Sequence, residues 1–338
     1  MRRKHQYKNL NGVFQMGKKL VYMILDTETA TLPFANEIAQ GNSEIKKRIA
    51  IAKPVIYDVG WTLMHRDGTI IKRVQHLITE TFSVPSVYRT AYYIDKRPLY
   101  LAMLDREEID CIPWREVMKE FELDLSTVDA VGAFNSMFDF KKAIPFTELY
   151  INKLYSPDFY KWEEMQYRLC KNIATGKAKK NEKEFNPDVF EFRGKTYPLF
   201  DVWGMSCQHV GTKYKDMCLK NGLLTPSGEY FKTSAETMYR YFTKDLDFEE
   251  AHTALADAEI ESYILAKLLK KRGLKIGIDY FPFQTLGHPA DYAKEKKNKD
   301  FMRVIADVMR DYVGEDEELS AYKKKLLRII KELEESIE

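Results

Sequence analysis

LVYMILDTETA, residues 20–30, is the stretch that decides the fold of this chain. It begins with apolar and aromatic residues and ends with acidic and hydroxyl residues. A short apolar run of this composition predicts a buried β-strand, and its polar end predicts that the strand emerges at a functional site.

The segments on either side continue a pattern of strands and helices. Residues 54–79, PVIYDVGWTLMHRDGTIIKRVQHLIT, contain two apolar runs around the turn signal Arg66-Asp67-Gly68, which predicts a β-hairpin. Residues 84–125 have mainly helical character, with loops expected around Pro98 and Pro113.

Two further strands are expected later in the chain. VDAVGAF, residues 128–134, predicts a second buried strand, and NSMFDFKKAI begins a helix directly behind it. PLFDVWGMSCQHV, residues 198–210, predicts a short strand that leads into a helix. This mixed order predicts an α/β fold in which a central mixed β-sheet is flanked by helices.

The clearest helix is HTALADAEIESYILAKLLKK, residues 252–271. Gly273 follows where a helix stop is expected. Its apolar stripe at helical spacing consists of Ile260, Ile264, Leu265, Leu268 and Leu269.

The predicted organisation has three parts. Residues 1–19 form a basic N-terminal extension, residues 20–272 the main domain, and residues 273–338 a charged helical C-terminal extension. The segment at about 150–195, with its charge run KAKKNEKE, interrupts the main domain and is interpreted as an insertion. The amphipathic stripe of the C-terminal extension predicts packing on the chain's own core, or contact with a partner.

Bulk composition narrows the class of protein. The chain has 338 residues, a net charge of +2 and 45% hydrophobic residues, which is ordinary globular composition. No stretch approaches the roughly 18 apolar residues of a membrane span, and the leader does not resemble a signal peptide. The four dispersed cysteines favour reduced thiols. We therefore expect a soluble cytoplasmic protein that does not bind membranes.

Asp26 and Glu28 lie two residues apart at the end of the first predicted strand. Side chains at this spacing point to the same face of a strand, so both carboxylates would enter one space. Two carboxylates on one buried face repel each other unless cations neutralise them, and hard ions such as Mg²⁺ prefer oxygen ligands. The alternative is a strand end with two solvated acids.

Two more polar sets accompany helix starts. Asn135 and Asp139 lie four residues apart on one face of the helix behind the second strand, where Asn135 is a candidate helix cap. His252 and Asp257 flank the start of the helix predicted at residues 252–271, among small residues that let a helix approach a sheet closely. Either set alone is also compatible with simple helix packing.

Together, DTET, NSMFD and HTALADAE closely resemble the three signature motifs of the DEDDh 3′-to-5′ exonucleases. This family includes the proofreading epsilon subunit of bacterial DNA polymerase III, ribonuclease T and oligoribonuclease. The resemblance covers about residues 20–146 and 196–272, with the motifs in the family's order. A histidine in the third motif corresponds to the histidine branch. The resemblance implies a ribonuclease-H-like fold.

The resemblance assigns Asp26 and Glu28 to the first motif, Asp139 to the second, and His252 and Asp257 to the third. Phosphodiester hydrolysis is suited to two divalent ions, Mg²⁺ or Mn²⁺, about 3.5–4 Å apart. We expect Asp26 to bridge both ions, Glu28 and Asp257 to complete one, and Asp139 to hold the second through water. His252 would take the proton of the attacking water, a role that suits an imidazole with its ordinary pKa of about 6.5.

Substrate contacts are expected next to the motifs. Thr29, Leu32 and Phe34 are candidates to pack against the terminal base and sugar, and Phe34 is a candidate stacking wedge. Core packing is the alternative for these residues. Asn135 is a further candidate for substrate binding.

The resemblance therefore implies a metal-dependent 3′-5′ exonuclease of DNA replication or repair. Its substrate would be single-stranded or frayed DNA ends, and its products 5′-nucleotide monophosphates. An exoribonuclease is the close alternative, because nothing in the sequence shows whether a 2′-OH is recognised. A non-catalytic nucleic-acid-binding or docking module is the second alternative, although it would not require all five motif residues. No polymerase domain is visible, so if the enzyme proofreads it does so in trans. The C-terminal extension is the candidate docking element for a polymerase or other protein partner.

Overall fold

The computed structural model describes residues 19–177, 189–208 and 210–271, together with residues 296, 297, 300, 302 and 328. Two compact units divide the chain. Of the three described stretches, 19–177, 189–202 and 249–271 belong to the first unit, and the rest belongs to the second. The expectations for the basic leader, the charge run after Lys177, Gly273 and the C-terminal extension fall outside these stretches.

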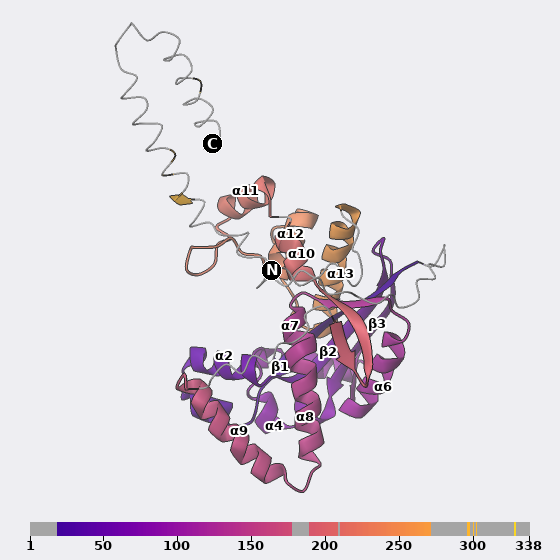
Figure 1. Cartoon of the computed structure of the whole chain (residues 1–338), viewed down its shortest axis with the longest axis vertical. Helices are drawn as coiled ribbons and strands as arrows, with labels where there is room; N and C mark the ends of the chain where they lie inside the picture. The colour runs from indigo at the N-terminus through magenta and orange to yellow at the C-terminus, as the bar shows by residue number, and fades with distance from the viewer. Residues whose placement is uncertain are drawn as a thin grey trace, which may run out of the picture. The chain divides into compact units, whose positions relative to one another are not determined.

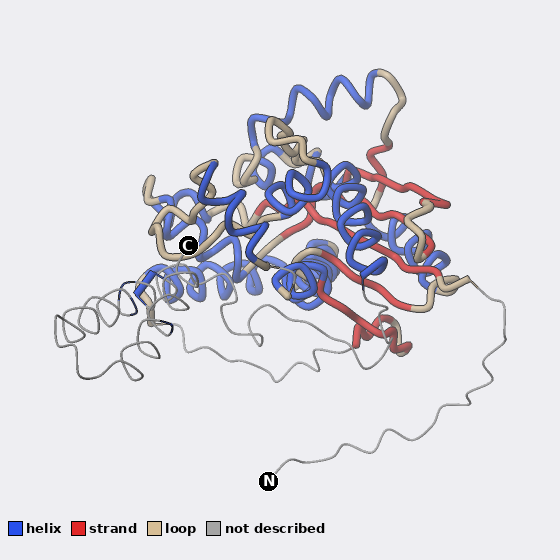
Figure 2. The backbone as a smooth tube through the Cα atoms, turned by 90° about the horizontal axis from the view of Figure 1, so that it is seen from above, coloured by secondary structure: helices blue, strands red, loops and turns tan. Residues whose placement is uncertain are grey.

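A seven-stranded mixed sheet organises the first unit, in the order β4-β3-β2-β1-β5-β7-β6. Strands β1, β2 and β3 are antiparallel neighbours, whereas β5 is parallel to β1 and β7 is parallel to β5. Figure 2 shows these strands in red among the blue helices. The predicted mixed sheet with flanking helices is confirmed. The strands are β1 Val21–Ala30, β2 Val55–His65, β3 Ile70–Ile78, β4 Asp110–Ile112, β5 Ala130–Ala133, β6 Val189–Phe192 and β7 Lys195–Asp201.

The helices of the first unit follow the predicted order with two differences. Pro98 lies inside the first turn of α5, not in a loop, because a proline there loses no intrahelical hydrogen bond. The helix behind β5 is interrupted by a π-helical turn, η2, that begins at Asp139. The bounds are α1 Ala35–Ala39, α2 Ser43–Ala52, α3 Thr79–Phe82, α4 Pro85–Tyr88, η1 Ile94–Lys96, α5 Arg97–Asp105, α6 Trp114–Leu125, α7 Ser136–Phe138, η2 Asp139–Ala143, α8 Ile144–Leu154, α9 Phe159–Ala174 and α13 Ala254–Lys271.

Side chains along β2 point alternately to the two faces of the sheet. Asp58, Gly60 and Thr62 face α13: Asp58 accepts a hydrogen bond from the Ala254 amide at 2.9 Å, and the Thr62 hydroxyl lies 2.6 Å from that of Ser262. Side chains two apart in a strand share a face, so these three residues form one contact line for the helix.

Gly60 permits the closest approach along this line. A Cβ atom added to Gly60 would lie 2.3 Å from the backbone nitrogen of Leu255 and 2.5 Å from the carbonyl carbon of Ala254. The first turn of α13 therefore packs directly on the β2 backbone, at a distance that no larger residue permits.

The opposite face of the sheet carries α6. Trp61, the neighbour of Gly60, stacks edge-on against Phe121 with ring centroids 5.5 Å apart, and its indole nitrogen donates to Asp124 at 2.8 Å. Helix α8 packs against β2, where the Thr147 hydroxyl accepts a hydrogen bond from the Ile56 amide. Figure 1 shows α6 and α8 beside the sheet. Both sides of the central strands are thus covered.

The predicted insertion contributes two elements of the first unit. Helix α9 packs against α1 and α2, and β6 forms the edge of the sheet by pairing with β7. The predicted apolar stripe of α13 is confirmed, because all five of its residues are buried.

The second unit is small and helical. It contains most of α10 Val202–Cys207, α11 Thr212–Lys220 and α12 Ala235–Thr243. Leu224 and Phe231 form an isolated bridge, and the Tyr214 hydroxyl donates to the carbonyl of Lys232. Ser234 caps α12 by accepting from the Thr237 amide.

Within the part of the chain that the structure describes, each helix is too short or too polar to cross a bilayer.

Gly60→Ala should destabilise the first unit by about 1–3 kcal/mol, because the added methyl group overlaps the backbone of α13. Ile71→Val is the control, because Ile71 is an exposed residue of the neighbouring strand β3 and this change should alter stability by less than about 0.5 kcal/mol. Urea unfolding of both variants measures the difference. Parent-like stability of Gly60→Ala would contradict the close approach.

Candidate metal centre

The end of β1 supplies the first two carboxylates. Asp26 pairs with Gly60 and Glu28 with Asp58 in the antiparallel ladder, so both carboxylates lie on the face that α13 covers. A register shift follows between Glu28 and Thr29 and ends this alternation. The predicted common face of Asp26 and Glu28 is confirmed.

The start of α13 supplies the next two groups. Glu28, His252 and Asp257 each offer one ligand atom, and these atoms all lie within 4.8 Å of one another. His252 Nδ1 is 3.7 Å from Asp257 Oδ2 and 3.8 Å from Glu250 Oε2. His252 lies outside the helix with φ of 53°, a left-handed backbone that non-glycine residues seldom adopt except where surrounding structure imposes it.

Asp257 indicates that this group suits a cation. It is 8% exposed, and its Oδ1 atom is buried without a hydrogen-bond partner among the described residues. A buried carboxylate oxygen normally has a partner, and oxygen and imidazole nitrogen are both ligands for divalent ions. The donor set therefore fits a divalent metal ion.

Asp139 lies beside this group but is held differently. It is buried, and its Oδ1 accepts a hydrogen bond of 2.6 Å from the Thr27 hydroxyl. The turn before it is anchored by Asp201, whose Oδ2 accepts from both the amide and the hydroxyl of Ser136 at 3.0 Å. The negative charge of Asp139 raises the pKa values of both Asp26 and Glu28, so the second motif lies next to the first.

Glu261 is a further carboxylate on this face. It lies one helical turn after Asp257, is 3% exposed, and accepts a hydrogen bond from the Phe134 amide at 3.1 Å. Of the surrounding charges, that of Glu261 contributes most to the pKa of Asp26. The hydrogen bond from Phe134, which follows β5, to Glu261 links the end of this strand to α13.

Burial and mutual repulsion raise the pKa of every acid in this cluster for which a shift is resolved. Burial first, then Glu261, raises the pKa of Asp26, although Asp26 keeps partial contact with solvent. Burial, then Asp257, raises the pKa of Glu28, and burial raises that of Asp139 to about 7. Acids packed in this way favour protons or cations, because either neutralises their charge.

The surroundings of His252 favour its charged form, whereas they disfavour the charged forms of the acids. Its interaction with the Asp257 carboxylate is the largest contribution that raises the pKa of the imidazole, with Glu250 adding to it and Lys96 opposing it. The ring stacks on Tyr93, with centroids 4.2 Å apart and planes 12° apart. These contacts hold the imidazole at the mouth of the carboxylate cluster.

Asp58 organises the scaffold under the histidine. Its carboxylate is fully buried and accepts hydrogen bonds from Gln75, from the Tyr100 hydroxyl at 2.8 Å and from the Ala254 amide. The Tyr100 hydroxyl also lies 3.5 Å from the His252 carbonyl. Strands β2 and β3, helix α5 and the start of α13 therefore meet at one carboxylate.

The candidate substrate contacts are more dispersed. The Thr29 carbonyl accepts a hydrogen bond from the Tyr92 amide, whereas the Leu32 side chain is buried in the core. Asn135 occupies the N-cap position of α7, but its side chain makes no capping hydrogen bond. The substrate-binding roles of these residues remain predictions, and for Leu32 the core-packing alternative describes this structure.

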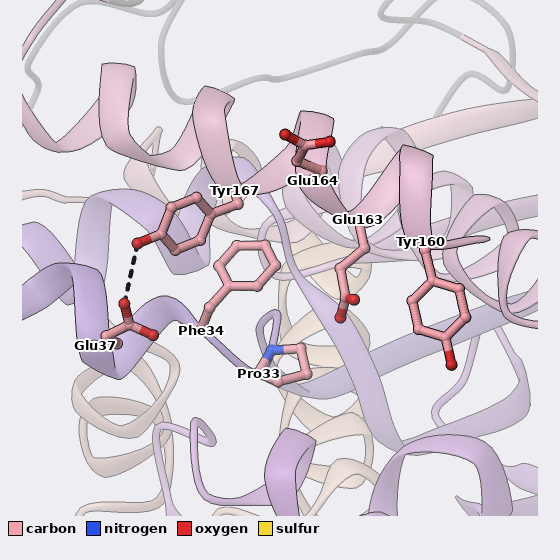
Figure 3. Close-up of a pocket in the computed structure, with 7 residues that line it drawn as sticks. All are labelled: Pro33, Phe34, Glu37, Tyr160, Glu163, Glu164 and Tyr167. Carbon is pink, nitrogen blue, oxygen red and sulfur yellow. Dashed lines mark hydrogen bonds between the residues drawn. The ribbon is translucent and has the colours of Figure 1, made fainter. Parts of the chain in front are cut away.

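Phe34 lines an open hollow of about 450 Å³ between the start of α1 and α9. Figure 3 shows its ring beside that of Tyr167, whose hydroxyl donates to Glu37 at 3.0 Å. The two rings meet edge-on with centroids 5.3 Å apart. The other lining residues are Pro33, Tyr160, Glu163 and Glu164. The carboxylates of this hollow would repel a phosphate chain.

No protein-family model matches this chain. No curated protein matches it at a significant level. Among solved structures, that of cell-death related nuclease 4 is similar to it with a TM-score of 0.35 and 10% sequence identity. The similarity covers 75% of this chain and 64% of that protein, so the chain spans less than two thirds of its length.

Sequence reasoning missed several residues around the site. Asp58 interrupts an apolar strand, and Glu261 follows Asp257 at helical spacing, so both carried a detectable signal. Thr27 lies inside the first motif, where only the acids were considered. Tyr93 carried no signal, because its contact with His252 joins residues 159 positions apart across a loop.

Asp58→Asn should reveal the proton that this buried carboxyl takes up on folding. Burial raises the pKa of Asp58 to about 6, above the value of about 3.9 for an unfolded chain. The stability that the folded state gains from this protonated carboxyl is fully present below about pH 4 and is lost as the pH rises through about 6. The stability lost in Asp58→Asn should therefore be greater at about pH 4 than at about pH 8.

Urea unfolding of the metal-free protein at both pH values measures this difference. Asp67→Asn is the control: hydrogen bonding to Thr69 lowers the pKa of that exposed carboxyl, so its contribution to stability is lost only below about pH 4 and the substitution should have nearly the same effect at both pH values. An equal loss for Asp58→Asn at both pH values would contradict the assigned shift.

Proposed function

We propose that this protein is a metal-dependent 3′-5′ exonuclease, which hydrolyses phosphodiester bonds at the 3′ ends of DNA and releases 5′-nucleotide monophosphates. The supporting observation is the convergence of Glu28, His252 and Asp257 within 4.8 Å, next to Asp26 and Asp139. These five residues are the ones that match the DEDDh exonuclease motifs. A ribonuclease-H-like arrangement of the mixed sheet belongs to the same proposal.

Asp26, Glu28, Asp139 and Asp257 would hold two divalent ions, Mg²⁺ or Mn²⁺. When bound, these ions supply an activated water and neutralise charge on the phosphoryl oxygens. The four carboxylates, which come from β1, η2 and α13, would position the scissile phosphate through these ions. Glu261, one helical turn after Asp257, is a further carboxylate of the cluster, and its charge acts on Asp26.

His252 would remove the proton of the attacking water. Its imidazole lies at the edge of the cluster, and Asp257 and Glu250 favour its protonated form. This stabilises the charge that the ring acquires when it accepts a proton. The same geometry admits His252 as a metal ligand, since its nitrogen belongs to the group of three. The two roles differ in whether metal affinity depends on the imidazole.

Digestion of a 5′-labelled single-stranded oligonucleotide tests the activity. We expect a ladder of products with Mg²⁺ or Mn²⁺ and none with excess chelator. Ca²⁺ should bind the carboxylates without supporting hydrolysis, because it is larger and holds its oxygen ligands in a looser, less strictly octahedral geometry. An oligonucleotide with a blocked 3′ end is the control and should persist. Hydrolysis in chelator, or equal degradation of the blocked strand, would contradict the proposal. Parallel RNA and DNA substrates determine whether a 2′-OH is required.

Asp26→Ala and His252→Ala separate metal binding from proton transfer. Asp26→Ala removes the proposed bridging ligand, so turnover and Mn²⁺ affinity should be lost together. His252→Ala should slow turnover by about 10²–10⁴-fold, the usual contribution of a general base, with Mn²⁺ affinity near that of the parent. Calorimetric titration with Mn²⁺ and initial rates measure both quantities.

His65→Ala, at the far end of β2, is the matched control and should change neither quantity. A large loss of Mn²⁺ affinity in His252→Ala would identify the imidazole as a ligand. Turnover within a few-fold of the parent would show that His252 is not the general base.

A further inference from the structure

A pair of tyrosines, Tyr92 and Tyr93, lies beside His252. Tyr93 stacks on His252, and Tyr92 meets Tyr93 edge-on with ring centroids 4.9 Å apart. The Tyr92 amide is tied to the Thr29 carbonyl, directly after Glu28, at 3.4 Å. The loop before η1 is thereby fixed to the end of β1.

The two rings differ in exposure. Tyr93 is half-buried, and burial, then the charge of Glu28, raises the pKa of its phenol. Tyr92 is 67% exposed, so the outer member of the pair presents an aromatic surface to solvent. An exposed ring contributes little to folding, because little of its apolar surface is removed from water.

We propose that Tyr92 is a stacking platform for the terminal base of a single-stranded nucleic acid, with Tyr93 fixing its position relative to His252. This inference rests on the proposed nuclease function and adds the residue that places the strand end. The chain of contacts Tyr92–Tyr93–His252 sets the distance between a stacked base and the group that acts on its phosphate.

The surrounding charges favour this use of the loop. Lys96, at the end of η1, lies near enough to His252 for its positive charge to act on the imidazole. A cation beside an acidic cluster suits a polyanion that must approach carboxylates. By contrast, Phe34 contacts Tyr167 in a hollow lined by carboxylates, so Tyr92 is the better placed of the two aromatic residues.

Binding to two labelled oligothymidylates tests the proposal: one ends in a normal 3′ nucleotide and the other in an abasic 3′ residue. Fluorescence anisotropy is measured in Ca²⁺, where no hydrolysis is expected. The parent should prefer the base-bearing end by roughly 5- to 150-fold, the range that base–aromatic stacking supplies. Tyr92→Ala should lose most of this preference, and Tyr92→Phe should keep it because the ring remains.

Tyr160→Ala is the matched control, since that tyrosine is 81% exposed on α9. It should preserve the preference of the parent. An unchanged preference in Tyr92→Ala, equal weakening of both oligonucleotides, or a parent that does not distinguish them would each overturn the platform. Hydrolysis by the parent in Mn²⁺ is measured separately. If the parent shows no nuclease activity but its preference still depends on Tyr92, the proposed function is rejected and the binding site is retained.

Discussion

The close approach of α13 to β2 at Gly60 is the constraint on which the site depends. Only a residue without a Cβ lets the backbone of Ala254 and Leu255 come this near the strand. The approach delivers His252 and Asp257 to the face where Asp26 and Glu28 emerge. Asp58 strengthens it by accepting the first amide of the helix, so strand and helix are joined by both packing and hydrogen bonding.

This packing concentrates negative charge in a poorly solvated space. Asp26, Glu28, Asp139 and Glu261 all have raised pKa values, with burial as the first cause. Neutral donors moderate the repulsion: the Thr27 hydroxyl serves Asp139, and the Phe134 amide serves Glu261. The orphaned oxygen of Asp257 has no such donor among the residues described. The cluster therefore attracts cations, since a bound cation relieves the repulsion between the carboxylates.

The surroundings of the cluster divide into surfaces of different chemistry. The hollow at Phe34 combines aromatic rings with Glu37, Glu163 and Glu164, which disfavours a phosphate chain. The loop that bears Tyr92 and Tyr93 combines aromatic rings with Lys96 beside the histidine. A strand end that reached His252 along this loop would meet stacking surface and positive charge together. The orientation of a substrate would then follow from the loop, while the chemistry would follow from the sheet and α13.

From the sequence alone, the strand at residues 20–30, the hairpin behind it, the strand before Asn135 and the helix that ends at Lys271 were all predictable. Their periodicity reports local backbone geometry, and the spacing of Asp26 and Glu28 reports a shared face. The tertiary structure alone decided the contacts between distant segments. These include the stack of Tyr93 on His252, the hydrogen bond of Thr27 to Asp139, and the meeting of Asp58 with Ala254. Such contacts depend on how elements far apart in the chain pack, and local sequence patterns carry no record of that packing.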